Sequence, residues 1–160
     1  MTDPGHERVM RTLAEIISGH RWDRLPEVFH DDAVLEYPQS GEVFRGVANI
    51  RGQFENYPGL EPGTSQLEEV IGDTTYAMTT TYTVIAVEGS GRQATAVIRV
   101  RYPDGSWWWA LNLNEVREGR ITRSRSYFAP DFEAPDWRAP YREAPRSVNP
   151  SEAHGIRSSD

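Results

Sequence analysis

The sequence contains no cysteine, which excludes disulfide bonds and thiol catalysis. It also has no apolar run long enough to cross a bilayer, and its opening residues, MTDPGHERVMRT, hold no apolar signal core. Basic residues are few: 17 Lys and Arg stand against 24 Asp and Glu, and the formal net charge is −7. This balance disfavours nucleic acid and anionic membrane surfaces as partners. We therefore expect a cytoplasmic protein with neither kind of partner.

Motifs that hold metals, nucleotides or phosphates are missing as well. The histidines at 6, 20, 30 and 154 do not have the spacing of metal ligands, which argues against a bound transition metal. The sequence has no Gly-x-Ser-x-Gly, phosphate loop or dinucleotide fingerprint, and Gly89-Ser90-Gly91 is typical of a hairpin turn. We expect no cofactor and no metal.

The first third of the chain has the apolar spacing of helices. Residues 4–18 form an amphipathic pattern that Gly19 can end, and a short helix is predicted to start near Asp23. A third helix is predicted over 47–56, before Pro58-Gly59. At 160 residues, the chain is long enough for one domain with a single core.

From residue 64 onward the pattern becomes extended and rich in Thr, Val, Tyr and Trp. The predicted strands are 65–71, 75–88, 92–102, 107–117 and 120–128. Gly-containing turn signals separate them, which is typical of an antiparallel meander. The whole pattern predicts an α+β domain in which three helices pack on one face of a curved, mainly antiparallel sheet, with a binding cleft between the two layers.

Residues 30–46, HDDAVLEYPQSGEVFRG, connect the helical and extended parts. We interpret His30-Asp31-Asp32 as the end of a helical stretch and 33–37 as a short strand that Pro38 terminates. A return strand is predicted over 42–44, after the turn at Ser40-Gly41. Such a connection can form the mouth of a pocket.

Prolines recur every five residues in the tail, in PDFEAPDWRAPYREAPRSVN. We therefore assign the domain to 1–128 and an arm to 129–160, with one short helical turn near 135–142. Phe132, Trp137 and Tyr141 could attach the arm to the domain or to a partner subunit. The polar residues 146–160 are expected to be mobile.

The order of these segments resembles the SnoaL-like branch of the nuclear transport factor 2-like (NTF2-like) superfamily. The matching residues are LPEVFHDDAVLEYPQSGEVFRG, NIRGQF and NEVREGRITRSRSYF, and FEAPDWRAPYRE is similar to tails of uncharacterised members. The resemblance covers about 6–143 and implies an NTF2-like cone. The family includes isomerases, cyclases, hydrolases, dehydratases and proteins without known catalysis, so the resemblance specifies the fold and not the reaction.

The resemblance also permits individual reactions to be tested. The carboxylate base of ketosteroid isomerases falls on Tyr37, and their oxyanion pair falls on Thr12 and Asn112, so steroid isomerisation is disfavoured. The aspartate expected in epoxide hydrolases falls on Ser126, and no Arg-x-Asp occurs on the predicted strands that precede it. Dehydratase-like chemistry would need a His and an Asp in the cleft, where His30 is the only nearby histidine.

The strand over 107–117 has two distinct faces. We predict that the face carrying Trp108, Asn112 and Asn114 lines the cleft, because an asparagine pair suits an oxygenated ligand. The alternative is that the asparagines satisfy backbone groups at a sheet end. The opposite face, with Trp107, Trp109 and Leu111, needs cover, which a homodimer interface or the tail would supply. We predict a homodimer through this outer sheet face.

Two charged clusters have a structural and a functional interpretation. Arg99 and Arg101 could form an exposed ion-pair ladder with Glu115, which we favour, or a substrate clamp. Asp31 and Asp32 more often cap or terminate a helix than act as paired catalytic carboxylates.

We predict a cleft that binds a small, partly apolar, oxygenated molecule. The same cleft could belong to a cyclase or isomerase that uses proton transfer, or be vestigial in a dimerisation module. The candidate catalytic residues are Tyr37, Asn112, Asp32 and His30. The candidate ligand-binding residues are Trp22, Phe44, Phe54, Tyr57, Tyr82, Trp108, Asn114 and Ser126.

Overall fold

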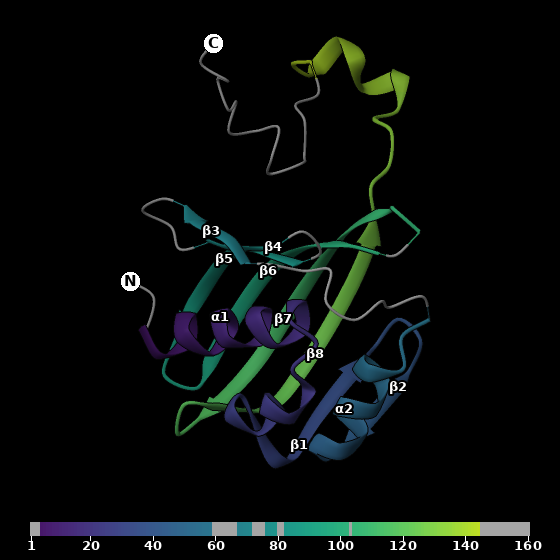
Figure 1. Ribbon diagram of the computed structural model, residues 1–160. Coiled ribbons are helices and arrows are strands. Elements are labelled where there is room, and N and C mark those ends of the chain that lie inside the picture. Colours follow the sequence, from purple (N-terminus) through teal and green to yellow (C-terminus); the bar gives the residue numbers. More distant parts are fainter. Residues whose placement is uncertain (1–3, 59–66, 72–75, 80–81, 103, 145–160) are drawn as a thin grey trace, which may run out of the picture.

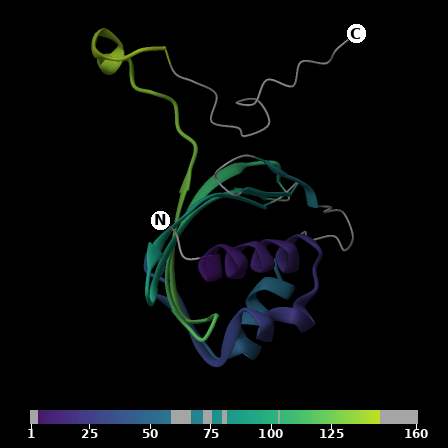
Figure 2. The same ribbon diagram turned by 90° about the vertical axis from the view of Figure 1, so that its left-hand side faces the viewer.

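A strongly curved sheet holds the helices against its concave face in the computed structural model of the protein (Figures 1 and 2). The structure describes residues 4–58, 67–71, 76–79, 82–102 and 104–144. Its strands are β1 (Phe29–Tyr37), β2 (Glu42–Arg45), β3 (Leu67–Ile71), β4 (Tyr76–Thr79), β5 (Tyr82–Ser90), β6 (Gln93–Arg101), β7 (Trp107–Arg117) and β8 (Arg120–Pro130). Their order across the sheet is β2-β1-β8-β7-β6-β5-β4-β3. Only β1 and β8 pair in parallel within this described part, so the predicted α+β class with a mainly antiparallel sheet is confirmed.

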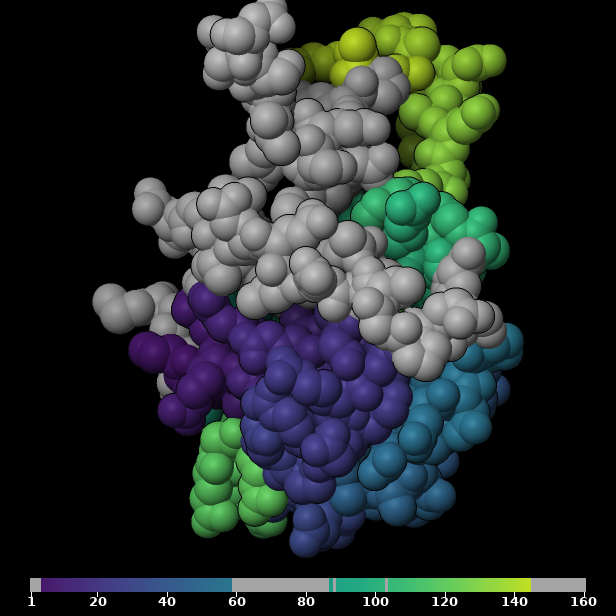
Figure 3. Space-filling view, in the orientation of Figure 1, coloured from purple at the N-terminus to yellow at the C-terminus, as the bar shows by residue number. Residues whose placement is uncertain are grey.

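The helices follow from the apolar spacing of their residues. Helix α1 (Pro4–Ser18) buries Met10, Leu13 and Ile16 among others, and lies against β4 and β5. A short 3₁₀ helix, η1 (Trp22–Glu27), replaces the second predicted helix, and α2 (Val47–Glu55) follows the third prediction. The space-filling view shows this helical layer, purple to blue, covering the face of the molecule turned to the viewer (Figure 3). No helix among the described residues is long and apolar enough to cross a membrane.

Gly46 starts α2 and ties it to the first strand. Its backbone N–H donates to the carbonyl oxygen of Ala33 over 2.8 Å, and its φ of 81° lies in the region that glycine adopts without strain. This contact places α2 beside β1, with Ile50 fully buried beneath it.

The prediction that His30-Asp31-Asp32 ends a helical stretch is wrong, because β1 already begins at Phe29. The backbone enters the sheet here: the N–H of Ile121 donates to the carbonyl oxygen of Val28 over 2.7 Å. A register shift against β8 between Phe29 and Val34 accommodates the two aspartates, which are exposed. The strand is therefore longer than the apolar pattern suggested.

The prediction of one strand over 75–88 is also wrong. The chain forms two antiparallel strands, β4 and β5, with Met78 opposite Thr83. No Gly or Pro stands between them to signal the break. Residues 65, 66, 75, 80 and 81 of the predicted extended runs lie outside the described residues.

The arm leaves the sheet at the end of β8 and projects away from the domain (Figures 1 and 2). It carries the predicted helical turn as η2 (Asp136–Tyr141). Phe132, Trp137 and Tyr141 are 80%, 69% and 86% exposed. Their attachment to a partner stays a prediction, and 146–160 lie outside the described residues.

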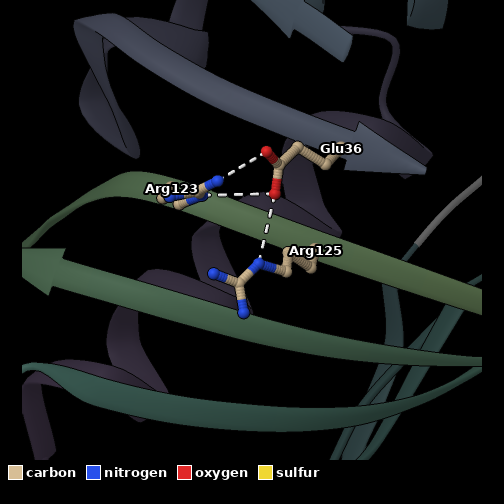
Figure 4. A network of polar contacts seen from close by, with 3 residues as sticks. All are labelled: Glu36, Arg123 and Arg125. Atoms are coloured by element: carbon tan, nitrogen blue, oxygen red, sulfur yellow. Dashed lines mark hydrogen bonds and ion pairs between the residues drawn. The ribbon is translucent and has the colours of Figure 1, made fainter. Parts of the chain in front are cut away.

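The outer, convex face of the sheet is partly charged. Glu36 on β1 accepts hydrogen bonds from Arg123 and Arg125 on β8, with the shortest N···O distance 2.6 Å, to Arg123 (Figure 4). The Arg123 hydrogen bond holds the pKa of Glu36 below its usual range, against the opposing effect of desolvation. This network ties the parallel pair together on the side away from the helices.

Candidate functional site

Tyr37 ends β1 and makes the central polar contact of the inner side. Its hydroxyl donates to Oε1 of Gln53 on α2 over 2.9 Å. Phe44 on β2 and Phe128 on β8 meet its ring edge-on, each with ring centroids 5.3 Å away. Pro38 follows directly and ends the strand, which fixes the ring at the sheet end.

The Tyr37 phenol is held in its neutral form. Burial raises its pKa most, and the nearby Tyr102 and Glu42 raise it further, while the Gln53 hydrogen bond only partly opposes them. A neutral phenol can donate a hydrogen bond to a ligand, but it cannot serve as a base at neutral pH. The Tyr37 phenol is therefore a hydrogen-bond donor.

A second aromatic group adjoins Tyr37 through Tyr102. The Tyr102 ring stacks on Tyr57 at 5.3 Å and meets Trp108 edge-on at 5.8 Å. Burial, and secondarily the Tyr57 phenol, raise the pKa of Tyr102 to about 12. Two of these rings, Tyr57 and Trp108, are predicted ligand-binding residues, and the structure brings them together around Tyr102.

Buried polar residues form two facing pairs on the inner face of β7 and β8. Asn112 lies opposite Ser126 and Asn114 opposite Ser124, and all four are buried. Ser124 is also the register partner of Leu35 on β1, so Tyr37, two residues further along, lies on the row of Ser126 and Asn112. The predicted inward orientation of the asparagine face is correct.

Several buried side-chain polar atoms lack a hydrogen-bond partner in the described structure, among them Nδ1 of His6 and Oγ of Ser18 on α1, and two others concern the polar row and Tyr37. These two are Oδ1 of Asn114 and Nε2 of Gln53. The amide nitrogen of Asn114 reaches only Sδ of Met10, a weak acceptor, at 3.5 Å. Buried polar groups normally have partners, so this acceptor and this donor are groups that a bound molecule could satisfy.

The other predicted ligand-binding residues are divided between the candidate site and the core. Trp22 is buried and stacks between His20 at 5.5 Å and Phe54 at 6.0 Å, so it packs in the core beside η1. Phe44 contacts Tyr37, as described above. Tyr82 begins β5, and the structure describes only its backbone.

Asp32 and His30 are not brought to Tyr37. Asp32 is exposed and lines a hollow of about 240 Å³ together with Arg92, Glu115 and Arg117. His30 is buried, with Nε2 2.9 Å from the carbonyl oxygen of Arg117. Tyr37 lies seven positions after His30 along β1, or roughly 23 Å away. Both are therefore remote from the candidate site.

This hollow and a second one among the described residues lie away from the inner polar row. The second, of about 340 Å³, lies between α1 and the turn joining β7 to β8, and includes Arg8, Thr12 and Glu118 in its lining. No three His, Asp or Glu side chains are grouped for metal binding in the same described part.

The prediction of an exposed ladder of Arg99 with Glu115 is wrong. Arg99 is 0% exposed and forms two hydrogen bonds with Asp131, one of 2.7 Å from Nη1 to Oδ1. Its guanidinium lies 5.2 and 4.7 Å from the ring centroids of Trp107 and Trp109. The two indoles and the carboxylate cover the cation on the outer face, which excludes a substrate clamp facing the helices.

Sequence reasoning missed four residues of the site: Gln53, Tyr102, Ser124 and Phe128. Gln53 follows the buried Ile50 by three positions, so helical spacing could have placed it on the inner face. Ser124 precedes Ser126 by two, and strand alternation could have paired them. Nothing in the local sequence signals the meeting of Tyr102 with Trp108.

Helices held in the concave face of a curved sheet, with polar residues on that face, define the NTF2-like class of α+β domains. The model of the SnoaL-like domain family matches residues 10–124. The chain belongs to this family, the SnoaL-like branch of the NTF2-like superfamily. No curated protein matches the chain.

Solved structures share the fold at low identity. An NTF2-like protein of unknown function from Burkholderia xenovorans is 22% identical, with a TM-score of 0.68 over 89% of this chain and 96% of its own. A putative ketosteroid isomerase from Kribbella flavida is 19% identical, with the same TM-score over 90% and 92%. A Catenulispora acidiphila protein with a ketosteroid isomerase-like fold, in complex with trimethylamine, is 15% identical, with a TM-score of 0.55 over 79% and 86%.

Proposed function

We propose that the inner face of the sheet binds a small, neutral, partly apolar molecule that carries both a hydroxyl and a carbonyl group. The observation that supports this most directly is the pair of buried atoms without partners, Oδ1 of Asn114 and Nε2 of Gln53. A ligand hydroxyl would donate to the first, and a ligand carbonyl would accept from the second. Aromatic rings beside them would take the apolar part of the molecule.

The absence of charge on the polar row favours a neutral ligand. Asn112, Asn114, Ser124 and Ser126 are uncharged, and the Tyr37 phenol stays protonated. A charged ligand would lose its hydration without gaining a counter-ion from these residues, which is costly. Binding without catalysis is therefore the function that these residues support.

A cyclase or isomerase acting in the same place is the alternative. Such an enzyme needs a base within hydrogen-bond reach of the reacting proton. Tyr37 meets an amide instead of a carboxylate or an imidazole, and Asp32 and His30 are remote. Chemical conversion of a bound compound would favour this alternative.

The test is a thermal-shift screen with oxygenated aromatics and steroids, extended by trimethylammonium compounds. The variant Asn114→Leu is nearly isosteric and removes the unpartnered acceptor. We expect neutral compounds with a hydroxyl group to raise the melting temperature of the native protein. The affinity of the variant for these compounds should be at least tenfold lower. Tyr127→Phe, on the outer face, is the matched control and should bind as the native protein does.

Two results would count against the proposal. One is stabilisation that survives Asn114→Leu unchanged, which would place the ligand elsewhere. The other is stabilisation by the ammonium compounds alone, because cation binding to aromatic rings does not need the amide groups.

A further inference from the structure

The arm carries apolar side chains that its own domain leaves uncovered. Phe132, Trp137 and Tyr141 are the three most exposed large apolar side chains in the described chain. Three such rings exposed to water within ten residues are unusual for a segment without a partner. Pro135 and Pro140 restrict the backbone between them, which lowers the entropy lost when the arm docks.

The root of the arm is fixed on the outer face of the sheet. Asp131 pairs there with the buried Arg99, between Trp107 and Trp109, and its N–H donates to the carbonyl oxygen of Trp107 over 3.4 Å. Beyond this anchor the arm points away from its own sheet (Figure 2). The ion pair therefore sets the direction of the arm.

The same outer face exposes apolar side chains along neighbouring strands. Leu111 on β7 lies opposite Tyr127 on β8, and Val43 on β2 lies opposite Glu36 on β1. All three are exposed. Arg123 and Arg125 border them, and the arm beyond Asp131 carries Glu133, Asp136 and Glu143 against Arg138 and Arg142.

We propose that two copies of this chain exchange their arms, each arm docking on the outer sheet face of the other copy. In a two-fold dimer every contact occurs twice, so one chain must carry both surfaces that meet. The arm and the outer sheet face are such a pair of surfaces on one chain. With 132–135 extended and 136–141 in η2, the arm past Asp131 reaches roughly 25 Å, which is enough to cross to a second sheet.

The surface area is sufficient for a stable complex. Each aromatic side chain buries about 150–250 Å², so six of them in two arms cover on the order of 1,000 Å². The sheet surface that these rings cover adds about as much area. The total buried area then exceeds the roughly 1,000 Å² that a specific interface needs. The acidic side chains of the arm meet a border of arginines, which favours the docked register.

The mass of the full chain in solution is the first test, measured by light scattering after gel filtration. We expect twice the protomer mass of 18.2 kDa. The double variant Trp137→Ser/Tyr141→Ser should dissociate at least tenfold more readily. Arg51→Ser/Glu55→Ser also removes one exposed charge of each sign, on α2 and away from both the arm and the outer sheet face, and is the control that should keep the native affinity.

Cross-linking tests the exchange itself, because the native chain has no cysteine. An Ala139→Cys chain is mixed with a Thr95→Cys chain, which labels the outer face, and treated with a short bismaleimide. A cross-link between the two different chains is expected. Three results would overturn the proposal. The native chain could be monomeric, or its dimer could be unaffected by Trp137→Ser/Tyr141→Ser. In a chain that carries both Ala139→Cys and Thr95→Cys, the cross-link could also form only within one chain.

Discussion

Tyr37 and Gln53 join the end of β1 to α2 by a hydrogen bond of 2.9 Å between a phenol and an amide oxygen. The Tyr37 ring is partly buried and packs against the core between Phe44 and Phe128. The hydrogen bond fixes the helix against the sheet and presents the remaining amide nitrogen of Gln53 to the inner face.

Tyr37→Phe should therefore destabilise the domain. The change removes the donor but keeps the ring, and it takes from the amide oxygen of Gln53 its part-buried hydrogen bond, at a cost of about 1 kcal/mol. Urea unfolding measures the difference in the free energy of unfolding. Tyr127→Phe, on the exposed outer face, should change it by less than about 0.5 kcal/mol. Equal effects of the two variants would contradict the importance of this hydrogen bond.

Alkaline pH should destabilise the fold through Tyr37 and Tyr102. Burial raises both folded-state pKa values above the ordinary value of 10.0, that of Tyr102 to about 12. The stabilisation by the neutral phenols is therefore complete below pH 10 and is lost as pH rises through the folded pKa values. Ultraviolet absorbance of tyrosinate, recorded with unfolding, measures this.

The double variant Tyr37→Phe/Tyr102→Phe is the control for that titration. It should unfold less steeply above pH 10, because two phenols that resist ionisation in the folded state are gone. Identical alkaline limbs in the variant and the native protein would show that other groups govern alkaline unfolding.

Local pattern was sufficient to predict most of the architecture. Helix α1, α2 and β7 lie where apolar spacing and turn signals put them, because each buries one face. The inward face of Asn112 and Asn114 also followed from alternation along β7. The features that the sequence analysis missed depend on contacts between residues far apart in the chain.

His30 and Arg99 illustrate why the other predictions failed. His30 follows a helical segment, and only the parallel pairing with β8 draws it into a strand. Arg99 looks like a surface residue until Asp131, 32 residues later, lies beside it and two indoles cover it. Neither contact leaves a signal in the adjacent sequence.

Asp131→Ala should destabilise the protein more than an exposed ion pair would predict. The variant leaves the fully buried Arg99 guanidinium without this carboxylate, and we expect a loss of about 3 kcal/mol. Glu55→Ala breaks the exposed pair with Arg51 and should reduce the free energy of unfolding far less, because solvent screens that pair. Chemical unfolding of both variants decides the matter, and a loss below 1 kcal/mol for Asp131→Ala would contradict the prediction.

Acid should weaken the outer network of Glu36 with Arg123 and Arg125. Because the Arg123 hydrogen bond, helped by the charges of both arginines, lowers the folded-state pKa of Glu36 from its ordinary 4.5, the stabilisation is present above that value and is lost as pH falls through the folded pKa. Glu36→Gln should therefore flatten the acid limb of the unfolding profile. Since both arginines are partly exposed, added salt should shrink the difference between the two proteins.

Glu133→Gln on the exposed arm provides the comparison for Glu36→Gln, because it removes the same charge at a site without this network. Its acid limb should follow that of the native protein. If Glu36→Gln and Glu133→Gln gave the same acid limb at low salt, the ion pairs of Glu36 would contribute nothing measurable, and the pairing of β1 with β8 would depend on backbone hydrogen bonds and the inner-face packing alone.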